Sequence, residues 1–124
     1  MLLNNLYIIQ SLSENDHQIQ ATIKLAADHA IFKGHFPGQP VLPGVCMMEM
    51  VAEITGDHLK KSLRISGGPL IKFLRMIDPQ INPVISLEIK YIESGNSIQT
   101  NGKIFSGSDS FMKFQLDLVP EPIA

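Results

Sequence analysis

The sequence predicts an α+β protein in which a curved antiparallel sheet wraps around one long central helix. Apolar and polar residues alternate in several short segments, a pattern typical of strands with one buried face. One apolar stretch near the middle of the chain is long enough to be a helix instead. With 124 residues, 44% hydrophobic and 18% charged, the chain can bury one core, so we expect a single domain over residues 1–124.

The clearest predicted strand is "QIQATIKL", residues 18–25, in which every second residue is apolar. A partner strand is expected before it at about 5–11. The later strands are separated by Gly, Pro, Asn and Asp turn signals. They are expected at 70–76, 84–93, 97–106 and 110–119, the last with Met112, Phe114, Leu116 and Leu118 on one face.

The long helix is predicted to begin at Gly44 or Val45 and to end at about Lys61. Its first three turns are apolar on nearly every side, so other structure should surround it. An antiparallel sheet curled around one such helix is a hot-dog fold. A single sheet leaves two edges unpaired, and pairing with a second copy of the chain is the expected remedy.

Charge and composition exclude several classes of function. The net charge of −2 and the pI near 6.0 do not favour nucleic acid or an anionic membrane as a partner. The start of the chain carries no basic region of the kind found in signal peptides, and we expect no membrane span. The lone Cys46 lies in an apolar run, where we interpret it as a small buried residue of a protein from a reducing compartment. A cytoplasmic protein is therefore expected.

Residues 33–50, "KGHFPGQPVLPGVCMMEM", form a rigid loop that leads directly into the helix. Pro37, Pro40 and Pro43 each restrict their own backbone and that of the preceding residue. Gly44 would open the helix, where the first backbone N–H groups lack intrahelical acceptors. Such groups can receive an oxyanion, and a glycine lets a ligand carbonyl approach the backbone closely.

Two side chains in this stretch suit acid and base chemistry. Glu49 lies one turn beyond Val45 among methionines, so burial should raise the pKa of its carboxyl group and fit it to act as a general acid. His35 stands at the start of the loop with a side chain suited to a general base. Glu53 and Asp57 continue the i, i+4 spacing, and we expect both to face solvent.

Asp28, His29, His35 and Glu49 offer side chains of the kinds that bind metal ions. Their spacings in the sequence match no compact ligand pattern, so no metal is expected.

The stretch "GHFPGQPVLPGVCMMEMVAE", residues 34–53, closely resembles the signature of the 3-hydroxyacyl-[acyl-carrier-protein] dehydratases, the FabZ family. The resemblance implies a hot-dog dimer, often assembled into trimers of dimers. Each active site would use a histidine from one subunit and a glutamate from the other. It implies that His35 removes the C2 proton of a 3-hydroxyacyl thioester and that Glu49 protonates the departing C3 hydroxyl. Gly44 and Val45 would bind the thioester carbonyl, and no cofactor is implied.

The chain departs from the family pattern at Glu53, where the family usually has glutamine. This second carboxyl group could perturb Glu49. The related dehydratase/isomerase branch, FabA, places Asp at the position of Glu49 and has a helix tryptophan; this chain has no Trp, so the isomerase is disfavoured.

Five basic residues lie between 59 and 76 without an acidic residue among them: Lys60, Lys61, Arg64, Lys72 and Arg75. They are candidates for docking an acidic acyl carrier protein and its acyl-phosphopantetheine chain. Charge that merely keeps the surface soluble is the alternative.

The predicted function is dehydration of a carrier-bound 3-hydroxyacyl thioester, in fatty acid synthesis or in a specialised acyl or polyene pathway. Two alternatives remain open at this point. One is a hot-dog thioesterase, which shares the fold and the thioester. The other is a non-catalytic subunit that pairs with another hot-dog dehydratase as a heterodimer.

Overall fold

The computed structural model describes residues 1–34 and 40–122. Its two helices are α1 (Ile31–Gly34) and α2 (Gly44–Leu59). Its strands are β1 (Tyr7–Asn15), β2 (Gln18–Leu25), β3 (Leu63–Phe73), β4 (Val84–Ser94), β5 (Ser97–Ser106) and β6 (Asp109–Pro120).

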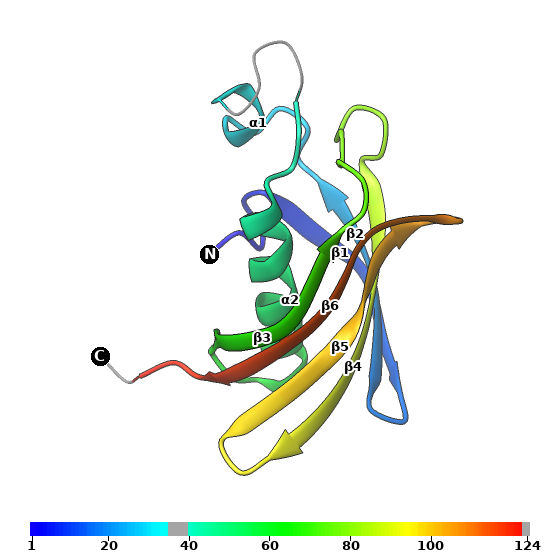
Figure 1. Cartoon of the computed structure of the whole chain (residues 1–124). Coiled ribbons are helices and arrows are strands. Elements are labelled where there is room, and N and C mark those ends of the chain that lie inside the picture. The colour runs from blue at the N-terminus through cyan, green and yellow to red at the C-terminus, as the bar shows by residue number, and fades with distance from the viewer. Residues whose placement is uncertain (35–39, 123–124) are drawn as a thin grey trace.

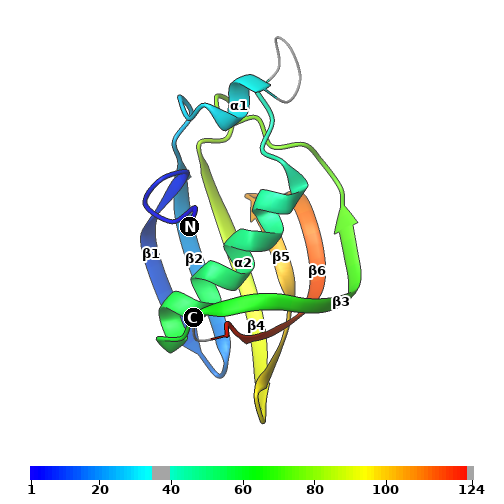
Figure 2. The ribbon, with the colours of Figure 1, turned by 90° about the vertical axis from the view of Figure 1, so that its left-hand side faces the viewer.

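The six strands form one antiparallel sheet in the order β1-β2-β4-β5-β6-β3. The sheet is strongly curved, and α2 lies against its concave face (Figures 1 and 2). This arrangement confirms the predicted α+β hot-dog fold. In the described residues β1 and β3 are the two edge strands.

Side chains of alternating polarity build the core as predicted. Ile19, Ile23 and Leu25 of β2 are buried, and so is the row of four apolar residues predicted on β6. The intervening Lys113 and Gln115 are exposed, and Asp117 is half-buried. One face of the sheet therefore packs on α2, while the other meets solvent.

Helix α2 is buried along most of its length, as its apolar sequence predicts. Its buried residues include Cys46, Met50 and Ile54. Two residues of α2 are exposed to solvent: the Val45 side chain is 71% exposed, and Asp57 is also exposed. No helix in the ranges 1–34 and 40–122 is long and apolar enough to cross a bilayer.

The expected bounds of the 70–76 strand were wrong, because β3 begins at Leu63 and ends at Phe73. Residues 67–69, Gly-Gly-Pro, interrupt the alternation that would have indicated a strand. The structure carries β3 through this point with register shifts against β6 between Ile65 and Gly67 and between Gly67 and Leu70. A proline without an N–H is tolerated there because β3 is an edge strand.

Two smaller expectations also needed correction. The first strand runs over Tyr7–Asn15 rather than 5–11, with a register shift between Ile9 and Ser11 where it pairs with β2. The short helix α1 was not expected. It is a single turn whose entrance is held by backbone and side-chain bonds around His29.

Candidate active site

The N-terminal end of α2 presents open backbone amides. Pro43 precedes the helix in an extended conformation, and it provides no side-chain cap. The amides of Cys46 and Met47 donate to the Pro43 carbonyl, but no described residue accepts a hydrogen bond from the amide of Gly44 or Val45. These two amides are the ones expected to receive a carbonyl oxygen, and that role stays a prediction.

Gly44 is closely covered by an aromatic ring. A Cβ added at Gly44 would lie 2.8 Å from Cζ and 2.9 Å from Cε1 of Phe73. Glycine is therefore the residue that lets the ring of Phe73 rest on the start of the helix.

An apolar cavity of about 640 Å³ opens beside this helix start. It is lined by the loop before α2, by α2 itself, by the last residue of β3 and by the segment after β3: Val41, Leu42, Pro43, Gly44, Val45, Met47, Phe73, Leu74, Arg75 and Met76. Apart from Arg75, its lining side chains are apolar.

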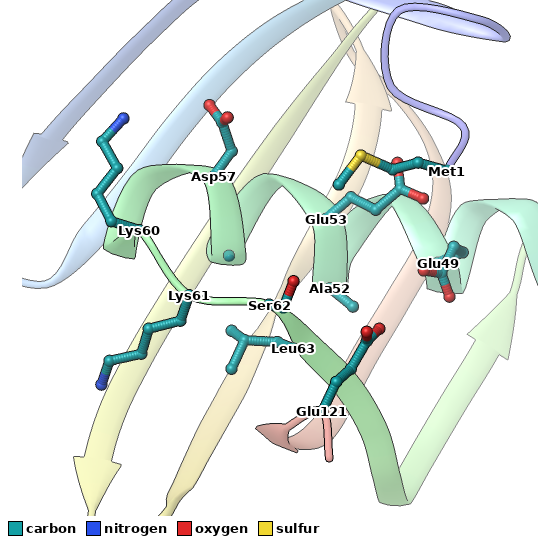
Figure 3. Close-up of a pocket in the computed structure, with 11 residues that line it drawn as sticks. Met1, Glu49, Ala52, Glu53, Asp57, Lys60, Lys61, Ser62, Leu63 and Glu121 are labelled. Atoms are coloured by element: carbon teal, nitrogen blue, oxygen red, sulfur yellow. The ribbon is translucent and has the colours of Figure 1, made fainter. Parts of the chain in front are cut away.

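Glu49 lines a second cavity, of about 520 Å³, which extends along α2 toward its C-terminal end (Figure 3). Glu49 and Glu53 come from successive turns of α2, while Met1 and Glu121 reach the same cavity from the two ends of the chain (Figure 3). Lys60 and Lys61 line it at the C-terminal end of α2.

The pKa of the Glu49 carboxyl group is raised, as predicted. Burial is the largest cause, followed by the negative charge of the neighbouring Glu53. Glu121 raises the pKa of Glu49 further, whereas the positive charge of the N-terminal amino group lowers it. The direction of these effects favours the protonated, proton-donating form of Glu49.

The expectation that Glu53 faces solvent was wrong, because the residue is only 6% exposed. The amide of Leu2 donates to its Oε2 at 2.9 Å, and the amide of Leu3 donates to its Oε1 at 2.8 Å. The Tyr7 hydroxyl donates to Oε1 at 3.0 Å. The N-terminal segment folds over α2 at this point and removes Glu53 from water. Asp57, by contrast, is exposed as expected.

His35 lies outside the described residues, so the pairing of its imidazole with Glu49 stays a prediction. Among residues 1–34 and 40–122, no cluster of three or more potential ligands could hold a metal ion. Cys46 is a buried free thiol, and burial raises its pKa. That environment agrees with its interpretation as a packing residue.

The five basic residues do not gather at one point. Lys60 and Lys61 line the cavity of Glu49, whereas Arg75 lines the apolar cavity at the opposite end of α2. Arg64 and Lys72 are exposed near the two ends of β3. The five basic residues are therefore distributed along the length of α2.

Two of these basic residues have acidic partners. The Lys61 ammonium lies 3.3 Å from the Glu93 carboxylate, and the Arg75 guanidinium lies 3.4 Å from that of Asp109. Both pairs are substantially exposed, so each contributes little to stability. Lys72 instead stands opposite Lys113 on β6, so like charges face each other there.

Sequence reasoning missed two residues of the site, Tyr7 and Phe73. Tyr7 is buried, and its hydroxyl meets Glu53 across 46 positions of sequence. Phe73 was assigned to a strand but not to the surroundings of Gly44. Local sequence patterns indicate neither contact, because both depend on how segments distant in the sequence pack together.

The curved sheet wrapped around the long helix α2 defines a hot-dog protein. The model of the ApeI-like family, described as ApeI dehydratase, matches residues 11–120, and the chain belongs to this family.

Named relatives agree with this assignment. The 3-hydroxyacyl-[acyl-carrier-protein] dehydratase FabZ of Novosphingobium aromaticivorans is 30% identical over 105 residues, covering 78% of this chain and 65% of that protein. The chain thus spans about two thirds of the length of that relative. The resemblance to the FabZ family noted in the sequence is confirmed.

Solved structures share the fold. The dehydratase heterocomplex ApeI:P from Xenorhabdus doucetiae contains a chain with a TM-score of 0.70 and 21% identity, covering 90% of this chain and 96% of that one. A hypothetical thioesterase with coenzyme A from Streptococcus pneumoniae has a TM-score of 0.61 and 12% identity, covering 93% and 85%. At these identities the likeness extends to the fold alone, which both kinds of protein use.

Proposed function

We propose that the protein dehydrates a 3-hydroxyacyl thioester carried on acyl carrier protein to the trans-2-enoyl thioester. The observation that carries the proposal is the position of Glu49. Its half-buried carboxyl group has a raised pKa and lies one turn beyond the open amides of Gly44 and Val45, in a chain of the ApeI-like dehydratase family.

In the proposed reaction His35 takes the proton from C2, and the electron pair forms the C2–C3 double bond. The C3–O bond breaks as Glu49 gives its proton to the departing hydroxyl, which leaves as water. His35 then holds one proton more and Glu49 one fewer than at the start, and proton exchange with solvent restores both groups. No cofactor takes part.

Negative charge develops on the thioester carbonyl oxygen as C2 loses its proton, because the electron pair left at C2 delocalises onto the carbonyl group. The proton next to a thioester is a poor acid, so this charge must be stabilised. The amides of Gly44 and Val45 stand at the start of α2, where N–H groups lack intrahelical acceptors and the helix dipole is positive. Donors fixed before the reaction supply much of the stabilisation in such sites. The apolar cavity beside them would hold the chain attached to the thioester.

The site requires assembly of at least two subunits. Within one chain Glu49 faces one cavity, and Gly44 and Val45 line another. A partner that packs against the exposed Val45 and pairs with the edge strand β3 would supply the loop of His35 to the Glu49 of this chain. We propose a homodimer, which can assemble further into trimers of dimers; a second hot-dog chain in a heterodimer is the competing arrangement.

Acyl carrier protein is the proposed macromolecular partner, and the cytoplasm is the proposed compartment. Arg75 lies at the apolar cavity, with Lys72 close to it on β3. Lys60, Lys61 and Arg64 lie toward the far end of α2, so their role depends on which subunit carries the bound acyl chain. Reversal of these charges is expected to weaken carrier binding most at low salt.

Mass analysis of products tests the function. The purified protein is incubated with a 3-hydroxyacyl carrier thioester. Loss of one water from the intact thioester supports the proposal. Release of the free acid would identify a thioesterase, and an unchanged thioester would indicate a subunit that needs a catalytic partner.

A further inference from the structure

Glu53 occupies a place built for a carboxylate. Three donors converge on its two oxygens: the amides of Leu2 and Leu3 and the hydroxyl of Tyr7, all within 3.0 Å. Each end of the group receives at least one backbone N–H. A glutamine, the residue usual in the FabZ family, would direct its NH₂ group at one of these N–H donors.

The Glu53 carboxylate lies beside Glu49. The two residues are four positions apart on α2, so they share one face of the helix, and both line the cavity of Figure 3. The backbone amides that hold Glu53 belong to the N-terminal segment, more than 45 residues away in sequence. This anchoring fixes the position of the carboxylate relative to its neighbour.

We propose that Glu53 is a positioning residue for Glu49: a carboxylate that the N-terminal segment locks in place beside Glu49, where its negative charge favours the proton-donating form of Glu49. The role of Glu49 as the proton donor rests on the proposed function. The electrostatic relation between the two carboxyl groups does not, and it can be measured without substrate.

Other charged groups also face Glu49. Glu121, which follows β6, adds negative charge, and the N-terminal amino group adds positive charge. Asp57, Lys60 and Lys61 line the same cavity at the C-terminal end of α2, and none of the three is among the main causes of the raised pKa of Glu49.

Two features single out Glu53 among these groups. It lies one helical turn from Glu49 on the same face of α2, and its charge raises the pKa of Glu49 more strongly than that of Glu121. Its burial also keeps water from screening that charge.

The test is a titration of the Glu49 carboxyl carbon by ¹³C NMR in the full-length chain, with the resonance assigned from E49Q. In E53Q we expect the midpoint of Glu49 to move to lower pH, because a neighbouring negative charge has been removed. The matched control is D57N, which removes an exposed carboxylate one turn farther along α2. It should leave the midpoint of Glu49 unchanged.

The pH profile of dehydration gives a second readout. Its alkaline limb, where the acid becomes deprotonated, should move to lower pH in E53Q and stay in place in D57N. A change in packing alone would lower the rate at every pH without moving the limb. An unmoved Glu49 midpoint in folded E53Q would overturn the proposal, whatever reaction the protein catalyses.

Should E53Q fail to fold, Y7F decides the question. It keeps the Glu53 carboxylate and both backbone donors while removing the hydroxyl, so the Glu49 midpoint should stay closer to that of the wild type than to that of an ordinary glutamate. A fall to the ordinary value in Y7F would show that packing, rather than the charge of Glu53, controls Glu49. If E53Q shifts the Glu49 midpoint but the protein dehydrates no substrate, the proposed function is wrong, while the electrostatic effect of Glu53 on Glu49 is still supported.

Discussion

Replacement of Gly44 by alanine tests whether the open start of α2 receives the thioester. The added Cβ would lie 2.8 Å from Cζ of Phe73. Carbon atoms in contact prefer about 3.5 Å or more, so the ring must retreat by about 0.7 Å. Phe73 is 52% exposed and can move toward solvent.

The two consequences of this change differ in size. Stability should change by no more than about 1 kcal/mol, because alanine favours the helix and the ring is free to move. The value of kcat/KM should fall by about 10²-fold, because a displacement near 1 Å in a positioned site has that effect. The methyl group would also narrow the approach to the amide of Gly44.

Steady-state dehydration assays and urea unfolding measure the two effects in parallel. G67A is the matched control on β3, where the nearest atom to an added Cβ is the Asp117 carboxylate at 3.8 Å, an ordinary contact. It should retain nearly normal activity. A G44A variant with the wild-type kcat/KM would refute the idea that the thioester approaches this part of the backbone.

Three further predictions concern the scaffold. The buried Thr55 hydroxyl has no hydrogen-bond partner among the described residues. T55V should therefore stabilise the fold by about 1 kcal/mol in urea unfolding. A loss of stability in T55V would show that the hydroxyl does have a hydrogen-bond partner. G102A should destabilise it by about 3 kcal/mol, because the new Cβ would lie 1.8 Å from the Glu88 carbonyl oxygen of the adjacent strand; unchanged unfolding would contradict this packing. Burial and the hydrogen bond to Glu14 raise the pKa of Tyr91 to about 12, so E14Q should lower it in an ultraviolet titration, and no change would exclude that bond.

The elements with one buried face were predictable from the sequence. Alternation identified β2 without error in its bounds, and the apolar stretch after Pro43 identified the start of α2. The pKa direction of Glu49 also followed from its sequence neighbours, because a residue flanked by methionines on a buried helix must lose water.

The first part of β3 and the state of Glu53 were not predictable from local patterns. The path of β3 through Gly67 depends on its pairing with β6. Glu53 has the spacing of a solvated helix stripe, and only the return of Leu2 and Leu3 over α2 buries it. Contacts between distant segments decide both features, and helical periodicity carries no information about them.

The most direct test of the account compares wild-type protein and E49Q in a single-turnover reaction with a 3-hydroxyacyl carrier thioester. The amide keeps the shape of the side chain but cannot donate the acid proton, so water loss should slow by about 10²–10⁴-fold while folding and assembly stay intact. Water loss by E49Q at a rate within a few-fold of the wild type would contradict the assignment of Glu49 as the proton donor.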